Sequence, residues 1–165
     1  MKIFRPLWRD GAFLVPQQFQ QQARWDAHVA DTVSRMALAH PWGVLRAEFD
    51  ASALTLSRLI VRFADGTLID TELADILPPV RDVSDVMQDS VEVLLALPLL
   101  SASGGNLDDG QESARPRRWR AEQVTVQELA GHERSELAVL RHALTLRLST
   151  EENAAFLTCP VARLV

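Results

Sequence analysis

The chain has 165 residues, and its 17 lysines and arginines against 22 aspartates and glutamates give a formal charge of −5. This length fits one domain, or two very small ones, with a core that needs neither metal nor disulfide. A content of 47% hydrophobic and 24% charged residues excludes a wholly disordered chain. The acidic balance argues against a dedicated nucleic-acid-binding protein, which usually carries a basic surplus.

The single cysteine, Cys159, excludes an intramolecular disulfide and favours a reducing compartment. The N-terminus has no apolar run of signal-peptide length. The longest apolar run, residues 93–100, is far shorter than the roughly 20 residues that span a bilayer. We therefore expect a soluble, cytoplasmic chain that does not insert into a membrane.

Residues 17–39 predict one long helix. Pro16 can open it, because proline lacks the N–H that would be unpaired in the first turn. Pro41 can close it, because the residue before a proline avoids the helical region. Between them there is no glycine or proline, and apolar residues recur along one arc with the 3.6-residue period.

The two faces of this helix differ. Asp31 and Arg35 form a favourable i,i+4 pair on its polar face. On the apolar face we expect Phe19, Trp25 and Val33 to form the core between the helix and a sheet. The apolar arc also includes Asp26, which requires a partner.

After Pro41 the period of the pattern changes from 3.6 to 2, which indicates strands. Residues 43–49 place Leu45, Ala47 and Phe49 on one half-buried face. Asp65-Gly66 separates two apolar runs and predicts a hairpin turn. The continuous apolar run of "SVEVLLALPL" predicts a strand that is buried on both faces.

The polar, glycine-containing residues 101–116 predict a mobile loop at the tip of a long hairpin. Residues 139–148 alternate, with Leu140, His142 and Leu144 on one face, although a helical template also fits them. With a last strand near the C-terminus, about seven or eight strands follow the helix. The predicted fold is mainly β: an antiparallel β-sandwich, or a barrel, over residues 42–165 with one long N-terminal amphipathic helix.

The sequence offers no clear catalytic, metal or cofactor site. None of the histidines has metal-ligand spacing, and His142 is best read as a hydrogen-bonded core residue. Cys159 lacks any local signature of a nucleophile. No glycine-rich phosphate loop follows a predicted strand. We therefore expect neither an enzyme nor a cofactor.

The only basic cluster is "RPRRWR" at residues 115–120, and it includes Trp119. Contact with a nucleic-acid backbone, with bases stacked on the tryptophan, is one reading. Protection of an exposed strand edge by arginines is the better one, and we expect no nucleic-acid partner.

Protein partners are the positive signal. Residues 1–16 are rich in apolar and aromatic side chains but have no clear period, so they either cover their own domain or enter a partner. Helix physics accounts for a polar first turn but does not require five glutamines between residues 17 and 22. We predict that this end of the chain binds a partner through Trp8, Phe13, Leu14, Pro16, Gln17 and Gln20.

The stretch "LWRDGAFLVPQQFQQQARW" closely resembles the N-terminal signature of the TssK family (VasE, ImpJ) of type VI secretion baseplate proteins, W-x-E-G-M-F-L-x-P-Q-H-F-Q-Q-Q-D-R-Y. Later blocks match in order, from "WGVLRAEFD" through "FADGTLID" to "LTCPVARLV". The departures from the signature are Asp10, Ala12, Gln18, Ala23 and Trp25.

The resemblance implies a docking segment at residues 1–16 and a shoulder domain at 17–165, similar to the shoulder of phage receptor-binding proteins. The neck and head domains of the family would be absent. It further implies a homotrimer when full length, docking on the TssF–TssG wedge, contact of the head with TssL and TssM, and a location near the inner membrane. It implies no catalytic activity.

Two other classes remain open. A small ligand- or carbohydrate-binding β-sandwich would need exposed aromatics on a strand face, whereas this chain has no tyrosine. An enzyme using Cys159 is the third possibility.

Overall fold

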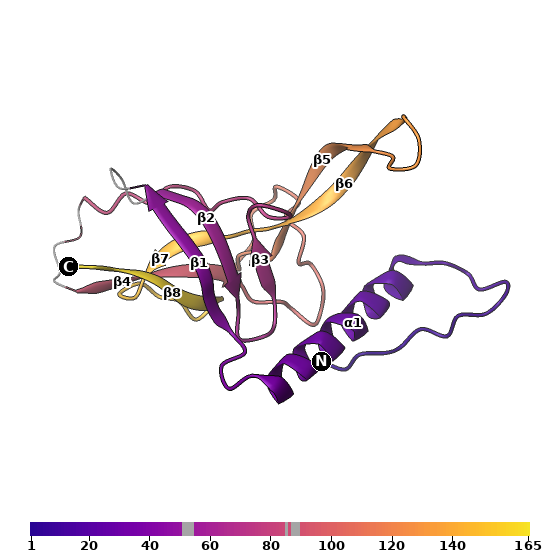
Figure 1. Cartoon of the computed structure of the whole chain (residues 1–165), viewed down its shortest axis with the longest axis horizontal. Coiled ribbons are helices and arrows are strands. Elements are labelled where there is room, and N and C mark those ends of the chain that lie inside the picture. The colour runs from indigo at the N-terminus through magenta and orange to yellow at the C-terminus, as the bar shows by residue number, and fades with distance from the viewer. Residues whose placement is uncertain (51–54, 85, 87–89) are drawn as a thin grey trace.

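The computed structural model describes residues 1–50, 55–84, 86 and 90–165, and its described part is mainly β with one helix (Figure 1). The helix α1 is followed by eight strands within these residues. The elements are α1 (Pro16–Ala37), β1 (Gly43–Asp50), β2 (Thr55–Arg62), β3 (Leu68–Asp70), β4 (Val91–Pro98), β5 (Trp119–Gln127), β6 (Arg134–His142), β7 (Thr145–Leu148) and β8 (Phe156–Leu164).

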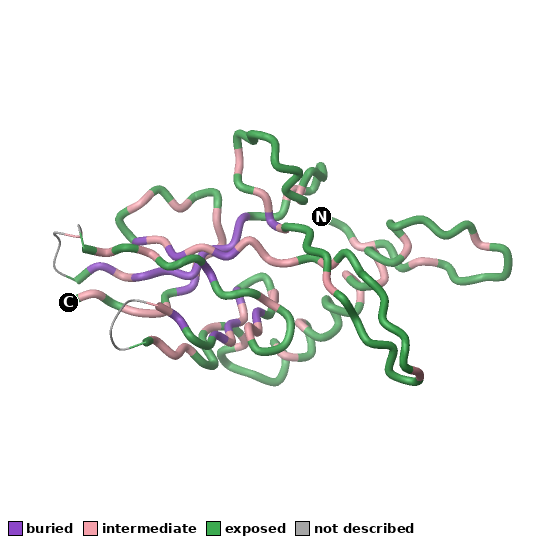
Figure 2. Tube along the Cα trace, turned by 90° about the horizontal axis from the view of Figure 1, so that it is seen from above, coloured by how far each residue is buried: buried purple, intermediate pink, exposed green. Residues whose placement is uncertain are grey.

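Two three-stranded antiparallel sheets, ordered β1-β2-β3 and β7-β4-β8, form the body of the molecule. Their side chains share one hydrophobic core. Strand β4 is central in its sheet. Val93, Leu95 and Leu97 are fully buried on one face, and Leu94 and Ala96 are buried on the other, so the expectation of a strand buried on both faces is confirmed. Figure 2 shows the buried residues concentrated along these sheets. Leu59, Val61 and Ile69 contribute from the other sheet, and Phe63 contributes from the position directly after β2.

The turn between β2 and β3 is the predicted Asp65-Gly66 hairpin. The Phe63 N–H donates a hydrogen bond to the carbonyl oxygen of Thr67 and so closes the turn. Gly66 has φ +91°, a conformation that favours glycine. The expectation for β1 is wrong at Leu45, which is 81% exposed. The pairing register of β1 shifts between Val44 and Arg46, and such a bulge turns one residue out of the alternation.

Strands β5 and β6 form a separate two-stranded sheet and project from the body as an arm, residues 119–142 (Figures 1 and 2). The strand reading of residues 139–148 is confirmed over the helical one, but one continuous buried face is not. Leu144, directly before β7, is buried, whereas Leu140 in the arm is 57% exposed. The chain leaves the body at this point, so the alternating pattern continues after the core has ended.

Residues 101–116 connect β4 to β5. These strands do not pair, so the expectation that this segment is a hairpin tip is wrong. Asn106 exchanges hydrogen bonds with the main chain of Ser101, and Leu107 forms an isolated bridge with Trp119.

Three arginines of the basic cluster, Arg115, Arg117 and Arg118, hold this connection in place, whereas Arg120 lies exposed in β5. Arg115 donates to the carbonyl oxygens of Gly104 and Gly105, and Arg117 donates to that of Leu107. Arg118 is buried. Most of the cluster therefore tethers the connection ahead of β5, and only Trp119 and Arg120 belong to the strand.

The part of the chain that the structure describes has no helix long and apolar enough to cross a membrane.

Candidate docking surface

The helix begins where the sequence places it and ends two residues early. Pro16 is its first residue, and Gln18 closes the start by accepting a hydrogen bond from the Val15 N–H at 3.0 Å through its side chain. This side-chain contact satisfies a backbone donor ahead of the first turn. The structure thus gives one of the five glutamines a capping role.

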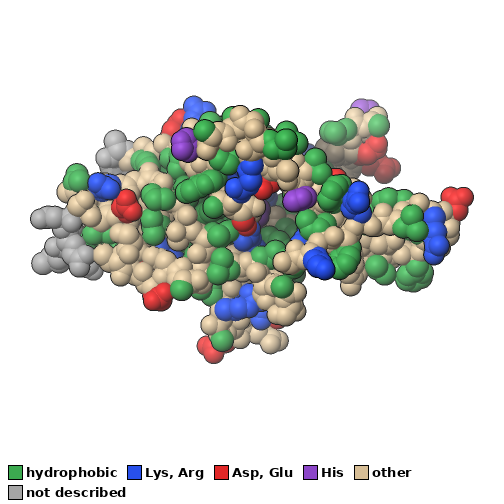
Figure 3. All heavy atoms as spheres, turned by 90° about the horizontal axis from the view of Figure 1, so that it is seen from below, with side chains coloured by type: hydrophobic (Ala, Val, Ile, Leu, Met, Phe, Trp, Pro, Cys, Tyr) green, Lys and Arg blue, Asp and Glu red, His purple; other side chains and the backbone are tan. Residues whose placement is uncertain are grey.

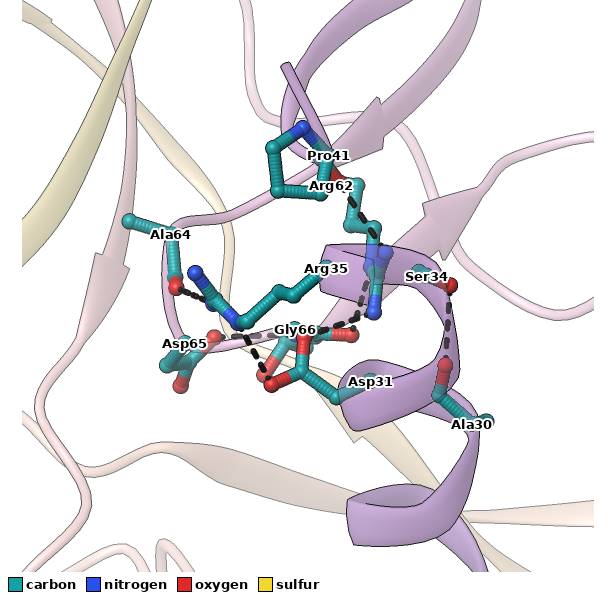
Figure 4. A network of polar contacts seen from close by, with 10 residues as sticks. Ala30, Asp31, Ser34, Arg35, Pro41, Arg62, Ala64, Asp65 and Gly66 are labelled. Atoms are coloured by element: carbon teal, nitrogen blue, oxygen red, sulfur yellow. Dashed lines mark hydrogen bonds and ion pairs between the residues drawn. The ribbon is translucent and has the colours of Figure 1, made fainter. Parts of the chain in front are cut away.

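The polar face of α1 attaches it to the body. Asp31 accepts hydrogen bonds from Arg62 of β2 at 2.7 Å and from Arg35 at 2.8 Å, which confirms the predicted i,i+4 pair. Arg35 also donates to the carbonyl oxygen of Ala64 in the β2–β3 turn (Figure 4). We call Asp31, Arg35 and Arg62 the brace.

The turn approaches the brace closely. Arg62 donates to the carbonyl oxygens of Pro41 at 3.0 Å and Gly66 at 3.5 Å (Figure 4). A Cβ atom on Gly66 would lie 2.8 Å from an oxygen of Asp31. Glycine at this position therefore serves both the positive φ of the turn and the contact with the helix.

Because the brace occupies the polar face, the apolar face of α1 points away from the body. None of the 22 residues of α1, all of which the structure describes, is buried. The outer stripe, as we name this face, remains open to solvent. It consists of Phe19 (58% exposed), Val29 (42%), Val33 (59%) and Met36 (83%).

The expected core between helix and sheet is therefore wrong. Phe19 and Val33 are exposed, and Trp25 is half-buried beneath the guanidinium of Arg5, which lies 4.7 Å from the ring centroid. An apolar stripe usually faces the core of its own domain. Here two ionic anchors, Asp31 and Arg35, set the orientation of the helix instead.

Residues 1–15, the tail, run back along α1 (Figure 1). The Phe4 N–H donates to the side-chain oxygen of Gln21 at 2.9 Å. Arg24 donates to the carbonyl oxygen of Lys2 at 3.2 Å. The tail therefore packs on the helix and not across the sheets. The sequence left open whether the tail covers its own domain or enters a partner, and this arrangement is intermediate, because the tail contacts its own helix but leaves the sheets uncovered.

Trp8 is the aromatic contact of the tail with the helix. Its indole N–H donates to Gln22 at 3.3 Å, and its ring meets that of Phe19 edge-on with centroids 6.2 Å apart. Gln22 in turn donates to Asp26 at 3.1 Å. This chain of contacts supplies the partner that Asp26 requires on the apolar arc.

The structure brings the predicted contact residues together at the free end of α1. The side chains of Phe13, Leu14 and Trp8 are 87%, 58% and 51% exposed. Gln17 and Gln20 are also exposed, and within the described residues their side chains make no hydrogen bond. Pro16 is exposed beside them at the first helical position.

The roles of Gln18, Gln21 and Gln22 were not anticipated from the sequence. All three bind the residues ahead of the helix, through the contacts given above. Only Gln17 and Gln20 remain free within the described part, so the excess of glutamines divides into a tail-binding set and an exposed set.

Arg118, directly before β5, joins three segments of the body. It donates to Asp65 at 3.0 Å, to the Thr67 hydroxyl at 2.7 Å and to the carbonyl oxygen of Pro98 at 3.1 Å. Burial opposes ionisation of Asp65, but the hydrogen bonds from Thr67 and from Arg118, with the charge of Arg118, outweigh it. The pKa of Asp65 is therefore held below its usual value.

The remaining candidate groups have structural surroundings. His142 is hydrogen-bonded as expected, through Nδ1 to Asp75 at 2.8 Å. Cys159 is buried, and burial raises the pKa of its thiol, which disfavours the nucleophilic thiolate. Among the described residues, no group of three or more histidine, cysteine, aspartate or glutamate side chains is placed to hold a metal ion.

Residues 18–165 match the family model described as "Bacterial Type VI secretion, VC_A0110, EvfL, ImpJ, VasE". The chain belongs to this family. The resemblance of the N-terminal motif to the TssK family is thereby confirmed. A curated VasE-family relative, the type VI secretion system baseplate component TssK1 of Pseudomonas aeruginosa, is 34% identical over 100 residues, which cover 58% of this chain and 22% of the relative.

Solved structures of TssK complexes are similar over nearly the whole chain. One chain of a TssK-TssF-TssG baseplate subcomplex is 69% identical, with a TM-score of 0.95, over 99% of this chain and 57% of that one. A chain of a type VI baseplate complex is also 69% identical, with a TM-score of 0.94, over 100% of this chain and 38% of that one. TssK from EAEC with a nanobody is 59% identical, with a TM-score of 0.74, over 89% of this chain and 49% of that one.

This VasE-family chain thus spans about a fifth of the length of its curated relative and between 38% and 57% of these three structures.

Proposed function

We propose that this chain is a structural, non-enzymatic part of a type VI secretion baseplate and that it docks an assembly of TssF and TssG. The supporting observation is its 69% identity and TM-score of 0.95 to a chain of the TssK-TssF-TssG subcomplex. Identity at this level makes a shared binding surface a reasonable inference, whereas a shared fold alone would not.

We place the docking surface on the tail, the first turns of α1 and the outer stripe. Two features support this location. The helix turns its apolar face outward, and Phe13 at 87% and Met36 at 83% exposure leave large apolar side chains in solvent. Exposed apolar surface of this kind is typical of protein interfaces, and buried aromatic anchors often dominate their binding energy.

Trp8, Phe13 and Leu14 would act as the anchors of this surface. Pro16 fixes the direction in which the tail enters the helix, and the free amides of Gln17 and Gln20 would supply hydrogen bonds at its polar rim.

The same proposal assigns residues 1–16 to a docking segment and 17–165 to a shoulder domain in which the two sheets of the body form a β-sandwich. In the full-length protein, neck and head domains would follow. The whole would be a homotrimer on the cytoplasmic side of the inner membrane, with its head linking the baseplate to TssL and TssM.

A pulldown of TssF and TssG with a Trp8→Ala, Phe13→Ala double variant tests the docking surface. We expect capture to be lost while the melting temperature stays nearly unchanged, because both side chains are more than half exposed. The matched control is Leu129→Ala at the tip of the arm, where an apolar side chain is 98% exposed. Capture by the double variant would show that the tail is not the anchor, and failure of the unaltered chain to bind would refute the proposed role.

A further inference from the structure

A cleft of about 550 Å³ separates α1 from the body. Its walls come from four places: the tail and α1 on one side, the β2–β3 turn and the base of the arm on the other. Figure 3 shows the molecule from below the view of Figure 1, with the tail and helix projecting beyond the sheets. The side chains used below are Ala27, Arg24, Asp31, Asp65, Arg118 and Trp119.

The carboxylates of the cleft are already neutralised within the chain. Asp31 pairs with Arg62 and Arg35, and Asp65 pairs with Arg118. Arg24 differs, because within the described residues its guanidinium donates to a backbone carbonyl but to no carboxylate. The cleft therefore presents one cation without a counter-charge.

The surrounding sequence has the same bias. Residues 1–26 carry four basic side chains against two acidic ones, although the whole chain has a net charge of −5. The tail and the first half of α1 thus carry a net charge of +2, four minus two, within an acidic protein. A partner surface complementary to this segment would be acidic.

Apolar surface also lines the cleft. The indole of Trp119 contributes from the base of the arm, and the methyl group of Ala27 contributes from α1. Arg118 lines the cleft as well, but its terminal nitrogens already donate to Asp65, Thr67 and Pro98, and its Nε is buried from solvent.

We propose that this cleft holds one extended segment of the docked protein, which carries aliphatic side chains and a carboxylate that pairs with Arg24. This inference rests on the proposed docking of TssF and TssG, and it adds a second contact region that is continuous with the first through the tail. The outer stripe would contact the folded surface of the partner, and the cleft would bind a single extended segment of the same partner.

Filling the cleft tests the inference independently of the outer stripe. Ala27→Trp places a large ring in the cleft without changing Trp8, Phe13 or the outer stripe. We expect the affinity of the full-length protein for the TssF–TssG assembly to fall by at least about tenfold. Ala138→Trp on the exposed face of the arm is the control, and circular dichroism checks the fold of both variants.

Charge reversal tests the chemistry of the segment. Arg24→Glu should lower the affinity by about tenfold or more, and Arg24→Lys should retain most of it, since lysine keeps the charge. Unchanged binding by Arg24→Glu would overturn the carboxylate assignment.

Alkylation gives a measurement that does not depend on a loss of affinity. In an Ala27→Cys variant a maleimide should react at position 27, because the native Cys159 is buried. TssF–TssG should slow this reaction by about tenfold, whereas equal rates would overturn the inference. If Ala27→Trp binds normally while the Trp8, Phe13 double variant does not, the cleft is empty and the docking proposal stands. If both bind normally, both proposals fail.

Discussion

Removing the carboxylate of the brace should release α1 from the body while leaving the core folded. In an Asp31→Ala variant, Arg62 loses its hydrogen bond to the helix but keeps those to the carbonyl oxygens of Pro41 and Gly66. Arg62 and Arg35 both lose their carboxylate partner but keep hydrogen bonds to main-chain carbonyl oxygens, so the effect should fall chiefly on the attachment of the helix.

The magnitude follows from the exposure of the pair. The side chains of Asp31 and Arg62 are 21% and 20% exposed, so their interaction should exceed that of a fully exposed ion pair. A hydrogen bond to a charged group contributes about 1.5–3 kcal/mol. We take about 2 kcal/mol, which corresponds to roughly a 30-fold change in the equilibrium between attached and released helix.

Hydrogen–deuterium exchange measures this equilibrium locally. The backbone amides of α1 in Asp31→Ala should exchange up to about 30 times faster than in the unaltered chain, and those of β4 should not change. Asp26→Ala is the matched control, because Asp26 bonds within the helix to Gln22 and not to the body. Faster exchange in β4 as well, or unchanged exchange in α1, would refute the assignment of the attachment to the brace.

Four further substitutions test the packing. Gly66→Ala should destabilise the fold by about 1–3 kcal/mol in urea unfolding, because alanine is strained at φ +91° and its Cβ would lie 2.8 Å from Asp31; normal stability would contradict this. The lowered pKa of Asp65 means that its ionised form stabilises the fold above the unfolded pKa of about 4, and that this stability is lost as the pH falls through the lower folded value. Asp65→Asn should therefore flatten the decline in melting temperature on acidification, and an unchanged slope would count against the pairing. Leu95→Ala should cost about 2–5 kcal/mol at a fully buried site, whereas Phe19→Ala should cost less than about 1 kcal/mol at an exposed one; equal costs would mean that the helix packs differently.

The local signals predicted the elements well. The change from a 3.6-residue to a 2-residue period located the helix and the first strand, and Asp65-Gly66 located a hairpin. These patterns depend on the nearest neighbours in sequence. For the same reason they could not separate Leu140 from Leu144, which alternate alike but lie on either side of the point where the chain leaves the body.

The orientation of α1 could not be predicted in this way. An apolar arc is evidence that something covers it, and the simplest assumption is a sheet of the same chain. Asp31 and Arg62 are 31 residues apart, so no local pattern reveals that they meet. The family motif located the docking end of the chain, but which of its glutamines bind the tail depends on distances that only the folded structure contains.

The brace also bears on how freely the sequence can change. Three of its contacts end on main-chain carbonyl oxygens, those of Pro41, Ala64 and Gly66. A carbonyl oxygen is present whatever side chain its residue carries. Substitutions at positions 41 and 64 that keep the local backbone should therefore leave the angle of α1 unchanged, and the direction in which the outer stripe points is encoded chiefly by three side chains.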